Sequence, residues 1–398
     1  MGDATWDSEA VLAAFWSGIQ EPGDPAAHRL RAHLGTAEAS AWVMSDRMPS
    51  TEGFPQCPAH EKERAGMKGR SRVATPKRTW RMAWESWHQR AVESDPDEDL
   101  AHVAQLGGRL LHPGHPEWPE NLEVLDERTP PALWVIGNLP GPRSVAIVGS
   151  RSCTPYGQKV AADLAYGVAE AGLTVVSGGA FGIDIAAHRG ALAAGETVAV
   201  LAGGLARPYP DAHEGIFKDI AGRGGLVAES PPSWRPARWR FLERNRLIAA
   251  LAHVTVVVEA ALRSGALSTI RQARRFGRQV CAVPGPVTSE TSVGPHLQIR
   301  ENATLVTSAR DVLEAANPIG EGPPMLFEFG EETRADKMPE ELRIAWDALP
   351  KEKATTVRRV AVAAGMSEPE ATSALESLRL EGLVIHDSEG WARAVEAL

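Results

Sequence analysis

The stretch VAIVGSRSCTPYG at residues 145–157 joins a short apolar run to the start of a helix. Val145–Val148 is continuously apolar and rich in β-branched residues, which is typical of a strand covered on both faces. Thr154 is a good N-cap, and Pro155 suits the first position of a helix. The stretch therefore predicts a buried strand, a tight loop, and a helix whose N-terminus faces that loop as an anion site.

The same texture continues along the chain, with helical patterns between short apolar runs. Alternating buried strands and amphipathic helices predict a parallel, doubly wound α/β sheet. We expect this sheet to occupy residues 101–316. The further predicted strands cover residues 173–176, 197–201, 226–228, 254–258, 279–283 and 304–306.

The flanking regions differ from this central part. Residues 1–100 are predicted to form a helical N-terminal domain, and the proline- and glycine-rich residues 317–337 a linker. Residues 338–398 show three helical patterns and a short hairpin, the order of a winged-helix domain. Ser367 and Glu370 form a capping-box pattern at the start of the third helix.

Three tryptophans in the N-terminal region fall at helical spacing, at positions 80, 84 and 87. Residues three to four apart share one face of a helix. Such a stripe usually packs in a core, which is the interpretation that we favour, and a base-stacking surface is the alternative.

The composition, with 43% hydrophobic and 23% charged residues in a chain of 398, is that of an ordinary globular protein. The chain has no apolar run long enough for a membrane span and no signal-peptide pattern at its start. Cys57, Cys153 and Cys281 are far apart, which fits neither a disulfide framework nor a zinc site. We therefore expect a cytoplasmic protein of two or three domains, with no metal, cofactor or membrane contact.

Positive charge is concentrated in one window of an acidic chain. Residues 231–280 contain ten arginines, two acids and no lysine, whereas the whole chain has a net charge of −9. A focused basic field suits a polyanion.

Two candidate loops follow the first two central strands. Gly149, Ser150 and Arg151 form the first loop, where a fork-shaped arginine can bind phosphate. The second contains Ser177-Gly178-Gly179, whose glycines let a backbone approach a ligand closely.

Asp184 and His188 follow the second loop and share one face of the next helix. They could act as an acid–base pair. The interpretation that we favour is structural: they hold the loop and the helix in place.

Two more candidates lie further along. Arg244, Asn245 and Arg246 follow Trp239 and Phe241, a mixture in which cations track phosphates and rings stack on bases. The alternative is that the two rings are core and the arginines are solvated.

The fourth candidate, Ser264-Gly265, follows a strand that ends near Glu259. Three of the candidates are loops after parallel strands, which meet at one edge of a sheet, and the basic segment leads into the helix before the next strand, so all four candidates can converge there. No Walker loop, nucleophile elbow or Cys/His constellation accompanies them.

In order, these segments resemble the signature blocks of the DprA/Smf (DNA-processing protein A) family. The resemblance implies an extended Rossmann-like fold that binds single-stranded DNA without catalysis, homodimerises, and loads the RecA recombinase on incoming DNA in natural transformation. The matching blocks are Gly149-Ser150-Arg151 with Tyr156-Gly157, Ser177–Asp184 with Ala187-His188, Tyr209-Pro210, Arg244-Asn245-Arg246, Val258-Glu259-Ala260 with Ser264-Gly265, and Val283-Pro284-Gly285.

Together, the residues and the resemblance predict the DNA- and phosphate-binding set Gly149, Ser150, Arg151, Ser177, Gly178, Gly179, Arg244, Asn245, Arg246, Ser264 and Gly265. The predicted supporting residues are Asp184, His188, Glu259, Trp239 and Phe241.

The sequence departs from the family pattern at His213, where asparagine is usual, and at Glu301-Asn302. Two other functions stay open. One is a Rossmann-like, phosphoribohydrolase-type enzyme that hydrolyses nucleotides, although the catalytic glutamate expected after Gly265 is missing. The other is a scaffold that acts only through its partner.

Overall fold

The computed structural model describes residues 8–58, 78–141, 143–317, 338–350, 353–388 and 390–394. The chain divides into two compact units, Met1–Gly322 and Pro323–Leu398, and each is described by itself. Apart from residue 317, the predicted linker 317–337 lies outside the described residues.

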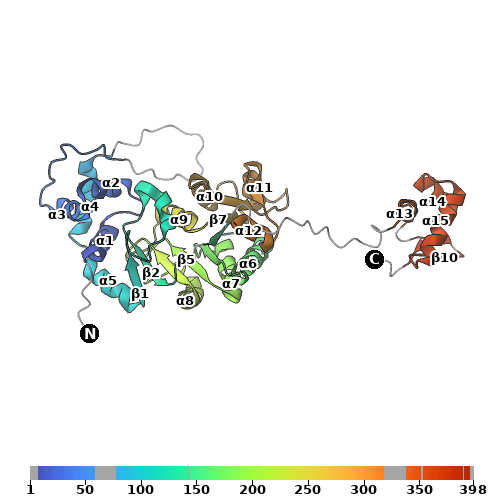
Figure 1. The fold of residues 1–398 in the computed structure, drawn as a ribbon, viewed down its shortest axis with the longest axis horizontal. Coiled ribbons are helices and arrows are strands. Elements are labelled where there is room, and N and C mark those ends of the chain that lie inside the picture. The colour runs from blue at the N-terminus through green and yellow to red at the C-terminus, as the bar shows by residue number, and fades with distance from the viewer. Residues whose placement is uncertain are drawn as a thin grey trace. The chain divides into compact units, whose positions relative to one another are not determined.

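A nine-stranded sheet forms the centre of the first unit (Figure 1), with the order β1-β2-β6-β5-β4-β3-β7-β8-β9 among the described residues. Neighbours from β6 to β9 are parallel, which confirms the predicted doubly wound sheet, whereas β1 and β2 add an antiparallel edge. The strands are β1 (Gly108–Leu111), β2 (Leu133–Gly137), β3 (Ser144–Val148), β4 (Thr174–Ser177), β5 (Thr197–Leu201), β6 (Gly225–Ala228), β7 (Val254–Val257), β8 (Gln279–Ala282) and β9 (Thr304–Leu305).

Helices cover both faces of the sheet because successive strand residues point to opposite sides. On β3, Val145 and Ile147 pack with α6, α7 and α12, whereas Ala146 and Val148 pack with α9 and α10. The helices and 3-10 helices of this part are η1 (Glu120–Arg128), α6 (Pro155–Glu170), α7 (Ile183–Ala194), η2 (Asp211–His213), α8 (Glu214–Arg223), α9 (Arg238–Leu251), α10 (Ala266–Arg275), η3 (Glu290–Ser292), α11 (Val293–Arg300) and α12 (Ala309–Ala316).

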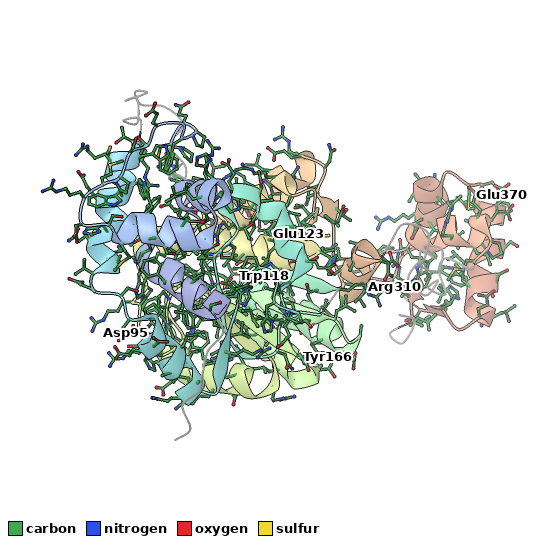
Figure 2. All side chains as sticks on the ribbon, turned by 60° about the vertical axis from the view of Figure 1, so that its left-hand side comes forward. Asp95, Trp118, Glu123, Tyr166, Arg310 and Glu370 are labelled. Carbon is green, nitrogen blue, oxygen red and sulfur yellow. The ribbon has the colours of Figure 1, made fainter. Side chains whose placement is uncertain are left out.

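The N-terminal helices belong to this same unit. Residues of α1 and α5 pack with β1, β2 and β6, and other residues of α1 pack with α2 to α4 in a second cluster. Trp80 and Trp87 are buried there, which confirms the core interpretation for two of the three tryptophans. Asp95 caps α5 at the surface (Figure 2). The helices are α1 (Ser8–Ile19), α2 (Pro25–Leu34), α3 (Thr36–Met44), α4 (Trp80–Ala91) and α5 (Pro96–Gln105).

The second unit holds three helices and an antiparallel ribbon among its described residues. The predicted capping box is present: Ser367 accepts from the Glu370 N–H, and the Glu370 carboxylate accepts from the Ser367 N–H. The winged-helix assignment stays a prediction. The elements are α13 (Glu340–Asp347), α14 (Val357–Ala364), α15 (Glu368–Leu380), β10 (Val384–Asp387) and β11 (Gly390–Arg393). Across the described ranges of the chain, no helix is both long and apolar enough to cross a membrane.

Candidate nucleic-acid interface

The site lies where the winding of the sheet changes direction, between β3 and β7. These neighbouring parallel strands send their helices α6 and α10 to opposite faces of the sheet. Backbone bonds hold their two loops together, because Ser150 N–H donates to the Glu259 carbonyl at 2.6 Å. Ligands of open α/β sheets bind at such a switch point, beyond the carboxyl ends of the strands.

A cleft of about 750 Å³ opens at this point. Three of the four predicted segments contribute predicted residues to its lining, whereas the loop after β4 contributes Ala180 but none of Ser177, Gly178 and Gly179. The predicted residues that line it are Gly149, Ser150, Arg151, Asp184, Trp239, Phe241, Arg244, Asn245, Ser264 and Gly265.

The lining of the cleft is strongly basic. Of the described residues that line it, four are arginines, Arg151, Arg238, Arg244 and Arg263, and Asp184 is the carboxylate. Arg151 and Arg263 are exposed to solvent, and Asp184 is buried. Guanidinium groups bind phosphate oxygens through forked pairs of hydrogen bonds, so the cleft presents hydrogen-bond donors for phosphate at its rim.

Aromatic rings stand among these arginines. Tyr209 and Trp239 are each 49% exposed, and both line the cleft beside Phe241. Phe241 meets Tyr209 edge to face at 5.8 Å between ring centroids, and the Arg151 guanidinium lies 5.0 Å from the Phe241 ring. Half-exposed rings next to cations can stack on the bases of a single strand.

Arg244 is the anchored arginine of the cleft. Its Nη1 donates to the Gly178 carbonyl at 2.8 Å and also to the Val200 carbonyl. Burial lowers the pKa of Arg244 to about 10, and the carboxylate of Asp184 opposes that shift. Arg244 therefore stays charged near neutral pH, and its guanidinium is fixed before any ligand arrives.

The glycine-rich loop after β4 packs closely against the side chains of Arg244 and Phe217, whereas we predicted that it approaches a ligand. A Cβ atom added at Gly178 would collide with the Arg244 guanidinium. Gly179 has a φ of +69°, and a Cβ atom there would meet the Phe217 ring. Ser177 is buried and donates to the Ile147 carbonyl at 2.7 Å. The close neighbours of the loop are thus side chains of the protein, and none of these three residues lines the cleft.

The structure does not bring Arg246, which was predicted to contact phosphate, into the cleft. Arg246 is completely buried, and its Nη2 lies 2.8 Å from the Glu229 carboxylate. A side chain in this position has no access to the cleft. Its neighbour Asn245 does line the cleft, and its Nδ2 donates to the Gly265 carbonyl at 3.3 Å. Asn245 thereby shapes the loop after β7.

Glu259 occupies the place where we expected an external anion. Its carboxylate accepts from the Thr154 backbone N–H at 2.8 Å and from Thr154 Oγ1 at 2.7 Å. The predicted N-cap of α6 is present, because Thr154 Oγ1 accepts from Gly157 N–H. The N-terminus of α6 is thus already neutralised by a carboxylate of the chain.

Asp184 and His188 do not meet a common substrate position. Asp184 lines the cleft and accepts from Ala180 N–H at 3.4 Å, and burial raises its pKa. His188 is buried, and its Nδ1 lies 2.7 Å from Thr197 Oγ1. Because Thr197 Oγ1 donates to the Val175 carbonyl, His188 Nδ1 is the donor of the pair. This geometry favours the structural interpretation over an acid–base pair.

Three charged or aromatic residues of the cleft lining were missing from our predicted set, namely Tyr209, Arg238 and Arg263. Each had a signal in the sequence, because Tyr209 belongs to a family block and both arginines to the basic window.

His213, which departs from the family pattern, is buried and contacts the Gly179 carbonyl through Nδ1 at 3.0 Å. Glu301 and Asn302 lie outside the lining of the cleft.

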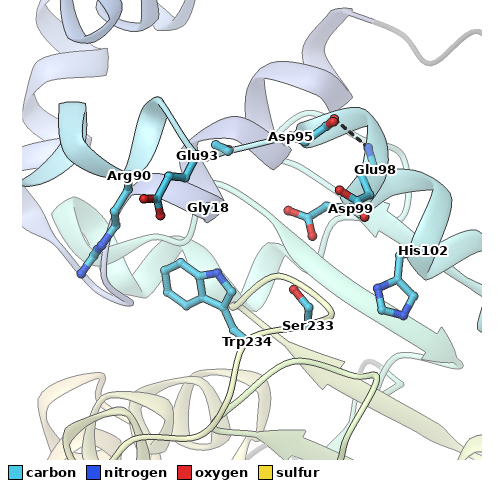
Figure 3. Close-up of a pocket in the computed structure, with 10 residues that line it drawn as sticks. Gly18, Arg90, Glu93, Asp95, Glu98, Asp99, His102, Ser233 and Trp234 are labelled. Atoms are coloured by element: carbon cyan, nitrogen blue, oxygen red, sulfur yellow. Dashed lines mark hydrogen bonds between the residues drawn. The ribbon is translucent and has the colours of Figure 1, made fainter.

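A second cavity, of about 360 Å³, has the opposite charge (Figure 3). The side chains of Glu93 and Asp99 stand around it with the indole of Trp234. Burial, together with the charges of Glu98 and Asp95, raises the pKa of Asp99 to about 6. Carboxylates repel phosphate, so the basic cleft is the better candidate for a nucleic-acid site. In the parts of the chain that the structure describes, no cluster of histidine, cysteine or acidic residues could hold a metal ion.

The model of the family described as DNA recombination-mediator protein A matches residues 109–317. A putative DNA processing protein DprA of Mycobacterium tuberculosis (strain ATCC 25618 / H37Rv) is 45% identical over 305 residues, which cover 72% of this chain and 77% of the relative. Protein Smf of Escherichia coli (strain K12) is 37% identical over 317 residues, which cover 77% and 82%.

A solved structure also resembles this chain. The X-ray structure of DNA processing protein A (DprA) from Streptococcus pneumoniae matches with a TM-score of 0.58 and 26% identity. The match covers 79% of this chain and all of that chain.

Proposed function

Because this chain belongs to the DNA recombination-mediator protein A family, we propose that its basic cleft binds single-stranded DNA. The observation that carries the proposal is the lining, in which four arginines and three aromatic rings surround one buried carboxylate. Arginine forks bind the phosphates, and exposed rings stack on bases. A duplex already stacks its bases on one another, so the rings favour a single strand.

The fixed geometry of the cleft supports this proposal. Arg244 is held by two backbone carbonyls, and Asn245 holds the loop that carries Gly265. Groups that are ordered before binding lose little conformational entropy when the ligand arrives. The exposed Arg151 and Arg263 can then adapt to the path of the strand.

We further propose that the protein acts without catalysis, as a cytoplasmic homodimer that protects incoming single strands and loads the RecA recombinase on them during DNA uptake in natural transformation. Membership of the family supports this role. The lining supports it too, because the carboxylate in the lining, that of Asp184, is buried and accepts a hydrogen bond from Ala180 N–H.

Fluorescence anisotropy of a labelled poly-dT strand tests the proposal, at two salt concentrations and with an unlabelled duplex as competitor. We expect tight binding that weakens as salt rises, because bound arginines release counterions from the strand. We also expect the duplex to compete poorly.

No binding of the folded protein at low salt would refute the proposal. The next assay would then be release of free base from nucleoside monophosphates, the reaction of the alternative phosphoribohydrolase-type enzyme.

A further inference from the structure

The carboxylate of Glu21 connects the loop between α1 and α2 to the start of α9. Its Oε2 accepts from Trp239 Nε1 and from Arg240 Nε, each at 3.0 Å. Its Oε1 accepts from Arg240 Nη2 at 3.1 Å and from Arg90 Nη2 at 2.7 Å. One carboxylate of the loop between α1 and α2 thus holds the indole and the guanidinium of two successive residues of the basic segment.

The contact between Glu21 and Arg240 is a forked, charge-assisted pair, which fixes orientation as well as distance. Their side chains are 21% and 12% exposed, so solvent and salt screen the pair only in part. Burial raises the pKa of Glu21, but the hydrogen bonds from Arg240 and Trp239 outweigh this effect and hold it below its ordinary value. The carboxylate is therefore charged at neutral pH.

Trp239 gains a fixed position from this contact. Its ring lines the cleft and is half exposed, so a large part of its surface is open to a ligand. Tryptophan suits the task because its N–H can be anchored at one edge while the ring stays free. An unanchored side chain would lose rotamer freedom when a base stacks on it, and the anchored ring has lost that freedom already.

Arg240 has different contacts from the arginines that line the cleft. Its charge is neutralised by Glu21, and its guanidinium lies 4.3 Å from the Trp234 ring and 5.6 Å from the Trp239 ring. Arg240 does not line the cleft. Loss of Glu21 should therefore weaken contacts with bases, without removing a contact with phosphate.

We infer that Glu21 is a positioning residue for single-strand recognition, which fixes the Trp239 indole as a base-stacking platform at the rim of the cleft. The inference rests on the proposed function, because only a strand with bases can use the platform. It gives the N-terminal helices a part in binding, although their cluster of buried tryptophans is not itself the stacking surface.

A double-mutant cycle with two probes tests this inference. The affinities of wild type, Glu21→Ala, Trp239→Ala and the double variant are measured for a poly-dT strand and for an abasic strand of equal length. Bases that stack on an aromatic ring gain affinity from it, so we expect Glu21→Ala, which frees the ring, to weaken poly-dT binding by about threefold or more. Abasic binding should stay the same or tighten, because Arg240 is released.

In the Trp239→Ala background, Glu21→Ala should change poly-dT affinity by less than about twofold, since the ring that it positions is gone. Glu127→Ala is the matched control, because Glu127 pairs with Arg29 between α2 and η1, and neither residue lines the cleft. Equal losses for both strands, or an undiminished loss in the Trp239→Ala background, would overturn the inference. Glu21→Leu, which fills the space but offers no acceptor to the indole, replaces Glu21→Ala if that variant fails to fold.

A measurement without DNA separates this inference from the proposed function. With 5-fluorotryptophan in the protein, the Trp239 fluorine resonance is assigned by its loss in Trp239→Phe. We expect Glu21→Ala to move that resonance toward the chemical shift of free 5-fluorotryptophan, and an unchanged resonance would refute the anchoring. If the resonance moves but the wild type binds neither strand, the proposed function and the stacking role both fail, whereas the anchor itself stands.

Discussion

Arg246 and Glu229 form an ion pair inside the protein, with 2.8 Å between Arg246 Nη2 and the Glu229 carboxylate. Solvent reaches 0% and 6% of the two side chains. Glu229 also accepts from Gly23 N–H at 3.0 Å, so the pair joins α9 to the loop between α1 and α2. Breaking a buried pair leaves one charge without a partner, which costs more than the pair contributes.

We expect Arg246→Ala to lower the free energy of unfolding by about 3–5 kcal/mol, because the carboxylate of Glu229 stays buried without its cation. Urea unfolding at neutral pH measures this loss. The double variant with Glu229→Gln should recover part of it. A stable Arg246→Ala protein that has lost only DNA binding would show that this arginine contacts the strand after all.

Arg151→Ala tests the phosphate contact at an exposed position. We expect it to weaken poly-dT binding by about 1.5–3 kcal/mol, the range for hydrogen bonds to charged groups. Its salt dependence should also become less steep, because one cation fewer releases counterions.

Arg189→Ala is the matched control, because Arg189 is exposed on α7 and does not line the cleft. Anisotropy and a thermal melt of both variants decide the question. Equal affinities of the two variants, with intact folding, would remove Arg151 from the site.

The sequence was sufficient for most of the sheet, because its inner strands are continuous apolar runs, as in Val145–Val148 and Thr197–Leu201. The antiparallel edge is a different case. Gly108–Leu111 is four residues long and half-buried at its start, so it shows neither a long apolar run nor clear alternation. Its strand pairing with β2 depends on contacts that no local pattern encodes.

The two arginines of the Arg244-Asn245-Arg246 block were predicted to act alike, and they do not. Residues two positions apart on a helix point to nearly opposite sides. Arg244 therefore reaches the cleft, whereas Arg246 reaches the interior. Helical spacing could have shown this division, but the partner of the second arginine, Glu229, lies on another element.

The contact of Glu259 with Thr154 shows a further limit of the sequence. The N-cap and the following proline correctly predicted where α6 begins. The carboxylate that neutralises this helix N-terminus comes from a residue 105 positions later. A local pattern therefore showed an anion-binding helix end, and only the fold showed that the chain supplies the anion.

His188 should make stability depend on pH. Burial, with the charges of Arg244 and His213, lowers its pKa from 6.5 to about 3. A folded pKa below the unfolded one means that this stabilisation is fully present above about pH 6.5 and is lost as the pH falls toward 3. The loss near pH 5 should be about 2 kcal/mol.

Urea unfolding of wild type and His188→Gln at pH 7.5 and near pH 5 measures this effect. The substitution removes the titrating group, so the stability gap between the two proteins should shrink at the lower pH. A gap that is independent of pH would show that His188 titrates at the same pH in the folded and unfolded states.

Asp99 should have the opposite pH dependence. Burial and the carboxylate of Glu98 raise its pKa from 3.8 to about 6, with a smaller opposing effect of His102. The neutral form is favoured in the folded protein, so this stabilisation is present below about pH 3.8 and is lost as the pH rises through 6. We expect Asp99→Asn to be more stable than wild type near pH 7.5, by less than about 1 kcal/mol because solvent screens a partly exposed group. Near pH 4 the gain should vanish.

Asp97→Asn, on the exposed side of the same helix, should show no such change between the two pH values. Thermal melts of wild type, Asp99→Asn and Asp97→Asn measure these differences. If Asp99→Asn were still more stable than wild type at pH 4, the charge of Asp99 would not be the source of the gain.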